Sequence, residues 1–377
     1  MSKLKLVTIV GTRPEIIRLS EVLKLADLCF NHTIVHTGQN WDYTLKDVFY
    51  RDLDLREPDY YLDSAGASLG QTMGSIIADT YDLLLKLQPD ALLILGDTNS
   101  TLSAISAKRL KIPIFHMEAG NRCWDWNVPE MINRKLVDHI SDINLPYTEN
   151  SRRYLLSEGI DGKTIFVTGS PMTEVLATQR GKIDASTVLE ELNLKSGKYF
   201  VLSAHREENI DDEKNFVSLM SAVNAIAEKY QMPIVYAMHP RSRNWVKKRG
   251  FVFHPQVIAH EPFGFIDYNH LQINAYCVLS DSGTLSEESA ILGFPGVLIR
   301  TSTERPEALD AGSVVIGGIT EKDITQAVNL AVSLRETQES VPLPGDYSDH
   351  NVSEKVVKLI QSYAKIVNET TWRNTCK

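Results

Sequence analysis

Short apolar runs alternate with amphipathic stretches along nearly the whole chain, and this alternation restricts the folds that the chain can adopt. The first half contains KLVTIV (5–10), HTIVH (32–36), ALLILG (91–96), PIFHM (113–117), DINLPY (142–147) and TIFVTG (164–169). The second half contains YFVLSAH (199–205), PIVYAMH (233–239), YCVLSDSG (276–283), GVLIR (296–300) and SVVIGG (313–318). Apolar runs that alternate with helical patterns are typical of parallel strands covered by helices on both faces. The sequence therefore predicts an α/β fold with parallel sheets.

The length of the chain indicates two domains. A chain of 377 residues exceeds what one hydrophobic core usually supports. The alternation loosens over residues 170–198 and then restarts, which places a boundary near residue 175. We predict an N-terminal domain over 1–175, a C-terminal domain over 176–350, and a final helix within 351–377 that packs back across the boundary.

The two halves resemble each other locally. Residues 92–116 and 275–300 share one plan, in which a strand, an Asp turn, a helix of small residues, a proline and a second strand follow in order. One explanation is that all such units look alike. The other is that two similar α/β domains face each other across a cleft, with helix N-termini directed at a ligand.

Composition excludes several classes of protein. The 39 basic and 48 acidic side chains give a formal net charge of -9, which argues against a general nucleic-acid binder. No run approaches the roughly 20 apolar residues that span a bilayer, and the N-terminal run is too short for a signal peptide. Cys29, Cys123, Cys277 and Cys376 have neither metal-ligand spacing nor the density of a disulfide framework. We expect a cytoplasmic protein that binds neither nucleic acid nor membrane.

No cofactor motif is visible in the sequence. Neither the G-x-G-x-x-G fingerprint nor a Walker P-loop occurs, so hydride transfer and ATP hydrolysis lack their usual support. We therefore expect an activity that needs neither a metal ion nor an added cofactor.

The segment SDSGTLSEESA predicts a phosphate site in the second half. Ser282, Gly283 and Thr284 follow a strand and precede a helix, where free backbone N–H groups and the helix dipole attract phosphate. Glu288 falls one turn later and could reach ribose hydroxyls. An ordinary helix N-cap explains the same residues, and both interpretations remain open.

Basic side chains follow other strands of the second half. His205 and Arg206 end one strand, His239 ends the next, and Arg305 precedes a further helix. Ligands of open α/β sheets bind beyond the carboxyl ends of the strands, and His and Arg suit a diphosphate there. One such residue is usually part of a surface loop, whereas two on neighbouring strands favour an anion site.

Acidic side chains hold the corresponding places in the first half. Asp97 and Glu118 end two strands, Glu130 begins a helix after Pro129, and Arg13 ends the first strand. A single acid at a strand end is usually a cap or turn residue. Three that converge on one edge suit general acid and base catalysis.

Eight segments together resemble a known family. They are VGTRPE, GDT, HMEAGNR, PEMINR, VTGSP, AHREEN, DSGTLSEE and TERPEA. Their order and spacing, from residue 5 to about 335, are similar to those of the bacterial non-hydrolysing UDP-N-acetylglucosamine 2-epimerases. The resemblance implies two Rossmann-like domains in the arrangement of the B-type glycosyltransferases, with the nucleotide in the cleft, and a homodimer. It also implies a reaction that inverts C2 of a UDP-2-acetamido sugar by eliminating UDP and adding it back.

The resemblance assigns roles to the residues above. Asp97, Glu118 and Glu130 become the acid and base candidates, and His205 with Arg13 would stabilise departing UDP. The set implied to bind substrate and UDP is Arg13, Arg18, Arg206, His239, Tyr268, Ser282, Gly283, Thr284, Glu288 and Arg305.

Several segments depart from the family pattern. Arg18 stands where the family has lysine, and Thr284 stands where it often has a second glycine. GQNWDY (38–43) and GAS (66–68) replace the segments through which UDP-N-acetylglucosamine activates its own enzyme, so that activation is not expected here.

The loop AGNRCWDWNVPE is shorter and more aromatic than its family counterpart. It resembles the branch that converts UDP-2-acetamido-2,6-dideoxy-L-talose into UDP-N-acetyl-L-fucosamine for capsule and O-antigen. Trp124 or Trp126 would suit the methyl group of a 6-deoxy sugar, or could equally pack the loop or a dimer contact. The other readings are a UDP-N-acetylglucosamine epimerase, a hydrolysing epimerase, a glycosyltransferase and a non-catalytic sugar-nucleotide sensor.

Overall fold

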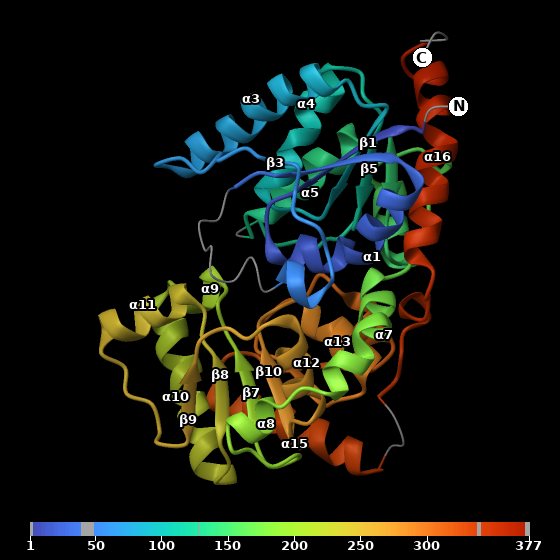
Figure 1. Cartoon of the computed structure of the whole chain (residues 1–377). Coiled ribbons are helices and arrows are strands. Elements are labelled where there is room, and N and C mark those ends of the chain that lie inside the picture. The colour runs from blue at the N-terminus through green and yellow to red at the C-terminus, as the bar shows by residue number, and fades with distance from the viewer. Residues whose placement is uncertain (1–2, 39–48, 127, 338–340, 374–377) are drawn as a thin grey trace. The chain divides into compact units, whose positions relative to one another are not determined.

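The computed structural model describes residues 3–38, 49–126, 128–337 and 341–373. Most of the departing segment GQNWDY lies outside these residues. The chain divides into two compact units, which Figure 1 shows as a cartoon coloured along the chain. The first unit comprises Met1–Thr178 and Ser348–Lys377, and the second comprises Gln179–Tyr347.

The first unit is built on a six-stranded parallel sheet of order β3-β2-β1-β4-β5-β6. Its strands are β1 (Lys5–Val10), β2 (Asn31–His36), β3 (Tyr60–Tyr61), β4 (Ala91–Leu95), β5 (Ile114–Met117) and β6 (Ile143–Leu145). Its helices include α1 (Arg13–Cys29), α3 (Leu69–Leu87), α4 (Ser103–Arg109), α5 (Glu130–Ile140), α6 (Glu149–Ser157), α7 (Pro171–Asp184) and α16 (Val352–Thr370), with the 3-10 turn η1 (Asn99–Leu102). Helix α7 continues past residue 178 into the second unit.

The second unit repeats this plan in a sheet of order β12-β11-β10-β7-β8-β9, again parallel. Its strands are β7 (Phe200–Ser203), β8 (Ile234–Ala237), β9 (Val257–His260), β10 (Cys277–Ser280), β11 (Gly296–Leu298) and β12 (Val315–Ile316). Its helices are α8 (Val188–Glu191), α9 (Glu207–Ile210), α10 (Glu213–Tyr230), α11 (Pro240–Arg249), α12 (Phe265–Ile273), α13 (Thr284–Leu292), α14 (Pro306–Asp310) and α15 (Glu321–Thr337). The α/β fold with two parallel sheets that the apolar runs predict is confirmed.

Both sheets have the same topology, because β7 to β12 occupy the places of β1 to β6. The strand order reverses between β1 and β4, and in the same way between β7 and β10. Ligands of open α/β sheets bind at the carboxyl ends of the strands beside this reversal. The topology therefore predicts that ligand-binding residues lie in the turns after β1 and β4 in the first unit, and after β7 and β10 in the second.

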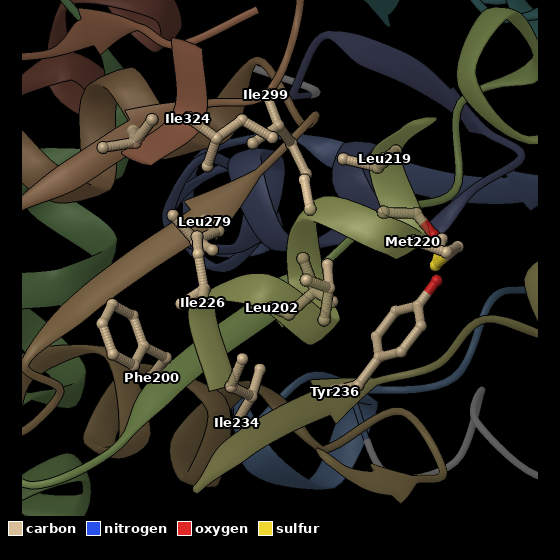
Figure 2. Packing of buried hydrophobic residues seen from close by; sticks show 14 of the residues in the cluster. Phe200, Leu202, Leu219, Met220, Ile226, Ile234, Tyr236, Leu279, Ile299 and Ile324 are labelled. Atoms are coloured by element: carbon tan, nitrogen blue, oxygen red, sulfur yellow. Dashed lines mark hydrogen bonds between the residues drawn. The ribbon is translucent and has the colours of Figure 1, made fainter. Parts of the chain in front are cut away.

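The core of the second unit explains why its strands are continuously apolar. Successive residues of a strand point to opposite faces of the sheet. Phe200 and Leu202 of β7 pack on one face, in a cluster with Ile226 of α10 and Ile324 of α15 (Figure 2). Val201 lies in the cluster of the opposite face. Burying one such side chain stabilises a fold by about 1.5–3 kcal/mol, so both faces favour apolar residues.

The C-terminal helix α16 belongs to the first unit, where it packs against α1 (Figure 1). Its first turn is held by Glu174 of α7, which accepts hydrogen bonds from the N–H of Ser353 at 2.8 Å and from its hydroxyl at 2.5 Å. A carboxylate at this end of a helix is favoured by the helix dipole. Lys355 of α16 also donates to the carbonyl of Thr168, at 3.1 Å. The search for membrane spans, made over the described ranges, found no helix long and apolar enough to cross a bilayer.

Candidate active site

The proposed acid Glu118 follows β5 and is held by two donors. Arg18 of α1 forms an ion pair with its Oε2, and Asn121 donates to its Oε1 at 3.1 Å. The hydroxyl of Ser151 donates to Asn121 Oδ1 at 3.0 Å, which fixes the orientation of that amide. The Glu118 side chain is 10% exposed, so these donors compensate a largely buried carboxylate.

Arg18 uses the planar shape of its side chain as well as its charge. Its guanidinium carbon lies 5.9 Å from the ring centroid of Tyr147, within the range of a cation–π contact. Arginine stacks on aromatic rings and binds carboxylates more readily than lysine does. The replacement of the family's lysine therefore fits its surroundings in this chain.

The backbone at Glu118 adopts an uncommon conformation. Its φ of 63° lies in the left-handed region, which side chains other than glycine seldom occupy outside turns and functional sites. The Glu118 N–H still donates to the carbonyl of Leu145, at 3.2 Å, so the turn remains attached to β6. The chain thus bends sharply at the residue whose carboxylate meets Arg18.

The proposed acid Asp97 follows β4 and is held by α5. Arg134 places both Nε and Nη2 at 2.6 Å from Asp97 Oδ2, and Asn133 donates to the Asp97 carbonyl at 2.9 Å. Glu130 begins the same helix, one turn before Arg134. Arg134 lies in the segment PEMINR, but the sequence alone predicts no role for it. Its spacing of four residues from Glu130, which puts both on one helix face, was the available signal.

Glu15 is a second residue that the sequence interpretation missed. It is buried at the start of α1. Its carboxylate accepts from the N–H of Gly11 and the hydroxyls of Thr12, Thr98 and Ser100. It therefore ties the turn after β1 to the turn that contains Asp97. The signal was the pattern T-x-x-E at the start of a helix, which is typical of a capping box.

Arg13, the predicted site residue that follows β1, is the first residue of α1. Its guanidinium carbon lies 5.4 Å from the ring centroid of Phe49. Pro14 occupies the first turn, where its missing N–H costs no hydrogen bond. The structure thus brings the turns of Arg13, Asp97 and Glu118 to the carboxyl edge of one sheet, as the sequence predicts.

In the second unit a buried aspartate organises the turn after β7. Asp281 follows β10 and is 0% exposed. Its Oδ2 accepts from the backbone N–H groups of His205 and Arg206, both at 2.9 Å, and from Asn209 at 3.2 Å. His205 Nδ1 lies 3.4 Å from Oδ1, while 40% of the His205 side chain is exposed. The sequence interpretation assigned no role to Asp281, although an Asp directly after a strand was visible in SDSG.

The two predicted histidines come together. His205 and His239 follow the neighbouring strands β7 and β8, and their ring centroids lie 5.7 Å apart. His239 also caps α11, since its Nδ1 accepts from the N–H of Arg241 at 3.2 Å. Two imidazoles at adjacent strand ends give this edge the donors that an anion needs.

The turn Ser282–Thr284 leads into α13. The hydroxyls of Ser282 and Thr284 lie 3.0 Å apart. Gly283 packs so closely on Glu304 that a Cβ there would lie 2.3 Å from Glu304 Oε1, so no larger residue fits without a shift. Glu304 accepts from Arg206 at 3.1 Å and from Arg300 at 2.8 Å. The glutamate therefore holds Arg206 close to the start of α13.

The other three predicted residues lie deeper in the second unit. Glu288 is buried and accepts from Gln272 of α12 at 2.7 Å, while Tyr268, one turn earlier on α12, packs half-buried against the core. Arg305 is buried just before α14, and its Nη2 lies 3.5 Å from Glu287 Oε1. Within the described part of the chain, no group of three or more His, Cys, Asp or Glu residues could hold a metal ion.

Comparisons with known proteins agree with one another. Residues 25–361 match the family model described as UDP-N-acetylglucosamine 2-epimerase. A structure of UDP-N-acetylglucosamine 2-epimerase from Rickettsia bellii is 41% identical, with a TM-score of 0.90 over 98% of this chain and 100% of its own. The Methanocaldococcus jannaschii UDP-GlcNAc 2-epimerase in complex with UDP-GlcNAc and UDP is 30% identical, with a TM-score of 0.88 over 95% of this chain and 99% of its own. A Pseudomonas aeruginosa UDP-2,3-diacetamido-2,3-dideoxy-D-glucuronate 2-epimerase is 32% identical, over 94% of this chain and 100% of its own.

The burial of Glu15 predicts a pH-dependent stability. Burial raises its pKa from 4.5 to about 7, against the opposing effect of its hydrogen bonds. Between these values the folded chain binds a proton that the unfolded chain releases. The stabilisation from this group is therefore complete below pH 4.5 and lost as the pH rises through 7.

Glu15→Gln should remove this dependence, because its amide can keep the four contacts without titrating. We expect the melting temperature of the variant, relative to wild type, to rise between pH 5 and pH 8. Differential scanning calorimetry at several pH values measures this difference. A difference that stays constant over that range would contradict the assignment.

Proposed function

Because the chain belongs to the UDP-N-acetylglucosamine 2-epimerase family, we propose that it inverts C2 of a UDP-2-acetamido sugar by eliminating UDP and adding it back. The observation that carries this proposal is the pair of carboxylates at adjacent strand ends. Asp97 and Glu118 are each held by an arginine, Arg134 and Arg18. Each arginine fixes the position of its carboxylate, and a general base must be held within hydrogen-bond reach of the proton that it removes.

The chemistry explains why carboxylates and a nucleotide site are both needed. The C2 hydrogen beside an acetamido group is not acidic. As UDP departs, it takes the electron pair of the C1–O bond, and the sugar gains oxocarbenium character. A carboxylate can then remove the C2 proton, whose bonding pair forms the C1=C2 double bond of a glycal. Return of a proton to the other face of C2, with UDP adding to C1, gives the epimer.

We assign the proton transfers to Asp97, Glu118 and Glu130 of the first unit. Asp97 and Glu118 reach one sheet edge from β4 and β5, and Glu130 begins the helix that supplies Arg134. His205 is assigned to the departure of UDP, together with Arg13. The partly exposed His205 side chain at the carboxyl end of β7 supports this, because an imidazole there can donate a hydrogen bond to a leaving diphosphate.

The second unit is proposed to bind UDP through the start of α13. Ser282, Gly283 and Thr284 offer backbone N–H groups and hydroxyls. Glu304 packs against Gly283 and accepts a hydrogen bond from Arg206, which holds Arg206 beside this turn. His239, Tyr268, Glu288 and Arg305 are proposed to complete this site, and Arg18 of the first unit is proposed to bind the substrate beside Glu118.

The substrate that we favour is UDP-2-acetamido-2,6-dideoxy-L-talose, converted to UDP-N-acetyl-L-fucosamine for capsule or O-antigen synthesis in the cytoplasm. The supporting observation is the loop between Glu118 and Glu130. Trp124 and Trp126 are 59% and 65% exposed, so neither ring is packed into the core. Lys135 Nζ lies 5.9 and 5.5 Å from their ring centroids. Two exposed rings suit a 6-methyl group better than they suit a hydroxyl.

The second candidate is UDP-N-acetylglucosamine as substrate, with UDP-N-acetylmannosamine as product. This candidate is favoured by similarity. The R. bellii and M. jannaschii proteins are both described as UDP-N-acetylglucosamine 2-epimerases, and both are similar to this chain over nearly its whole length.

An isotope experiment tests the reaction and the substrate together. Each of the two UDP sugars is incubated with the protein in D₂O, with EDTA and without NAD, and the products are read by NMR. We expect product with deuterium at C2, faster from the talose substrate. Substrate with ¹⁸O at the bridging C1–O should scramble that label within the diphosphate. An oxidation–reduction route would leave the C1–O bond intact, so turnover without scrambling would contradict elimination.

Variants of the two held acids test the assigned roles. Glu118→Gln and Asp97→Asn should each lower kcat by about 10²–10⁴-fold, the usual effect of losing a positioned acid or base. UDP affinity, measured by calorimetry, should stay within a few-fold of wild type, because neither carboxylate is itself assigned to UDP binding. Asp82→Asn, at an exposed position on α3, is the matched control. Near wild-type turnover in either variant would remove that residue from the mechanism.

We also propose a homodimer, formed through α3. Residues at intervals of four form an apolar stripe, in which Leu69, Tyr81 and Leu85 are 64%, 39% and 54% exposed. A Cβ added at Gly70 or Gly74 would meet no atom within 4 Å. A stripe of large side chains beside glycines is self-complementary, as a two-fold interface requires.

Light scattering should give twice the 42.3 kDa of one chain for wild type. Leu85→Glu should give the monomer mass, because it would bury a charge in the interface. Leu28→Glu, at a position 73% exposed on α1, should stay dimeric. A wild type of monomer mass at micromolar concentration would contradict the dimer.

A further inference from the structure

A buried contact between a histidine and an aspartate lies beneath the turns that carry the two held acids. His116, on β5, and Asp138, on α5, are 1% and 0% exposed at their side chains, and His116 Nδ1 lies 3.0 Å from Asp138 Oδ1. Neither of these two atoms has a hydrogen-bond partner among the described residues, so the 3.0 Å approach is a close contact without hydrogen-bond geometry. The pair is therefore the only polar contact that each atom has there.

The other ring nitrogen of His116 reaches the turn of Asp97. His116 Nε2 lies 2.7 Å from the carbonyl oxygen of Gly96, which can only accept, so Nε2 carries the hydrogen. Gly96 directly precedes Asp97 and has a φ of 78°, in the left-handed region. The peptide that joins them is planar. Fixing the Gly96 carbonyl therefore fixes the plane from which Asp97 extends.

The other carboxylate oxygen of Asp138 reaches the turn of Glu118. Asp138 Oδ2 accepts from the N–H of Gly120 at 3.1 Å and lies 2.8 Å from Arg122 Nη1. Gly120 has a φ of 84°, and a Cβ there would lie 2.5 Å from the carbonyl oxygen of Ser151, so this turn needs glycine. Glu118, two residues earlier, also has a left-handed backbone.

We propose that the His116–Asp138 pair positions both acids, by holding the Gly96–Asp97 turn from one side and the Glu118–Gly120 turn from the other. The inference rests on the proposed function, in which Asp97 and Glu118 transfer protons. Glu118 has a left-handed backbone, which persists in a residue other than glycine only where surrounding contacts fix it. Neither His116 nor Asp138 is assigned to the substrate, so they are positioning residues.

The test compares two isosteric replacements of the histidine. In His116→Gln the side-chain amide can occupy the place of Nε2 and keep the bond to Gly96. In His116→Asn the amide takes the place of Nδ1, so the contact with Asp138 stays and the bond to Gly96 is lost. We expect kcat of the Asn variant to fall by about 10–100-fold, since a displacement of about 1 Å can cost 10²-fold. The Gln variant should retain most of its kcat, and the UDP dissociation constant should change in neither.

His32→Gln is the matched control, because it changes a second His–Asp contact of the same unit, one that joins β2 to a partly exposed aspartate of α1. His32 is 1% exposed, and its Nδ1 lies 2.6 Å from Asp27 Oδ1. It is the second residue of β2, away from the carboxyl edge. We expect this variant to lower the melting temperature and leave kcat unchanged, which separates positioning from stability.

Three outcomes would overturn the proposal: wild-type kcat in a folded His116→Asn, equal losses in the Asn and Gln variants, or a fall in kcat for His32→Gln. Should His116→Asn fail to fold, Asp138→Asn decides, because its amide oxygen can accept from Gly120 and Arg122 while its NH₂ group faces His116. Its kcat should stay within about threefold of wild type, and a loss of tenfold or more would overturn the positioning role. A wild type that exchanges no C2 proton would instead refute the proposed function, before any variant is compared.

Discussion

All six strands of each sheet run in the same direction, and the rest of the structure depends on this constraint. Parallel strands end at one edge, so the turns after them meet there whatever their separation in sequence. In the first unit this brings the turns of Arg13, Asp97 and Glu118 together over more than 100 residues of chain. Since both faces of the sheet are buried, polar chemistry is confined to this edge.

Charges gathered at such an edge need partners, and the partners come from the helices. Arg18 from α1 and Arg134 from α5 each hold one proposed acid, while His116 and Asp138 support the backbone beneath them. A buried charge that loses its partner is strongly destabilising, by about 3–5 kcal/mol. The pairs that compensate the buried charges at this edge therefore also fix the acids in position.

Two aspartates at matching places in the two sheets have different uses. Asp97 after β4 is 20% exposed at its side chain and meets an arginine. Asp281 after β10 is fully buried and accepts from backbone N–H groups of the turn after β7. One topology thus supplies a carboxylate proposed for proton transfer in the first unit, and a carboxylate that shapes a proposed anion site in the second.

The sequence by itself determined the fold class and which turns carry the chemistry. Apolar runs specify buried strands, and parallel strands leave their end residues at one edge. For this reason the sequence could predict that His205 and His239 lie close together. Only the tertiary structure decided how these residues are held. Arg134, Glu15 and Asp281 act through partners 37, 83 and 75 residues away in sequence. The local spacing of residues indicates which segments form helices or strands, whereas long-range contacts depend on how the helices pack on the sheet. The placement of α16 beside α1 has the same origin, because an amphipathic pattern shows that a helix has an apolar face but not which surface covers it.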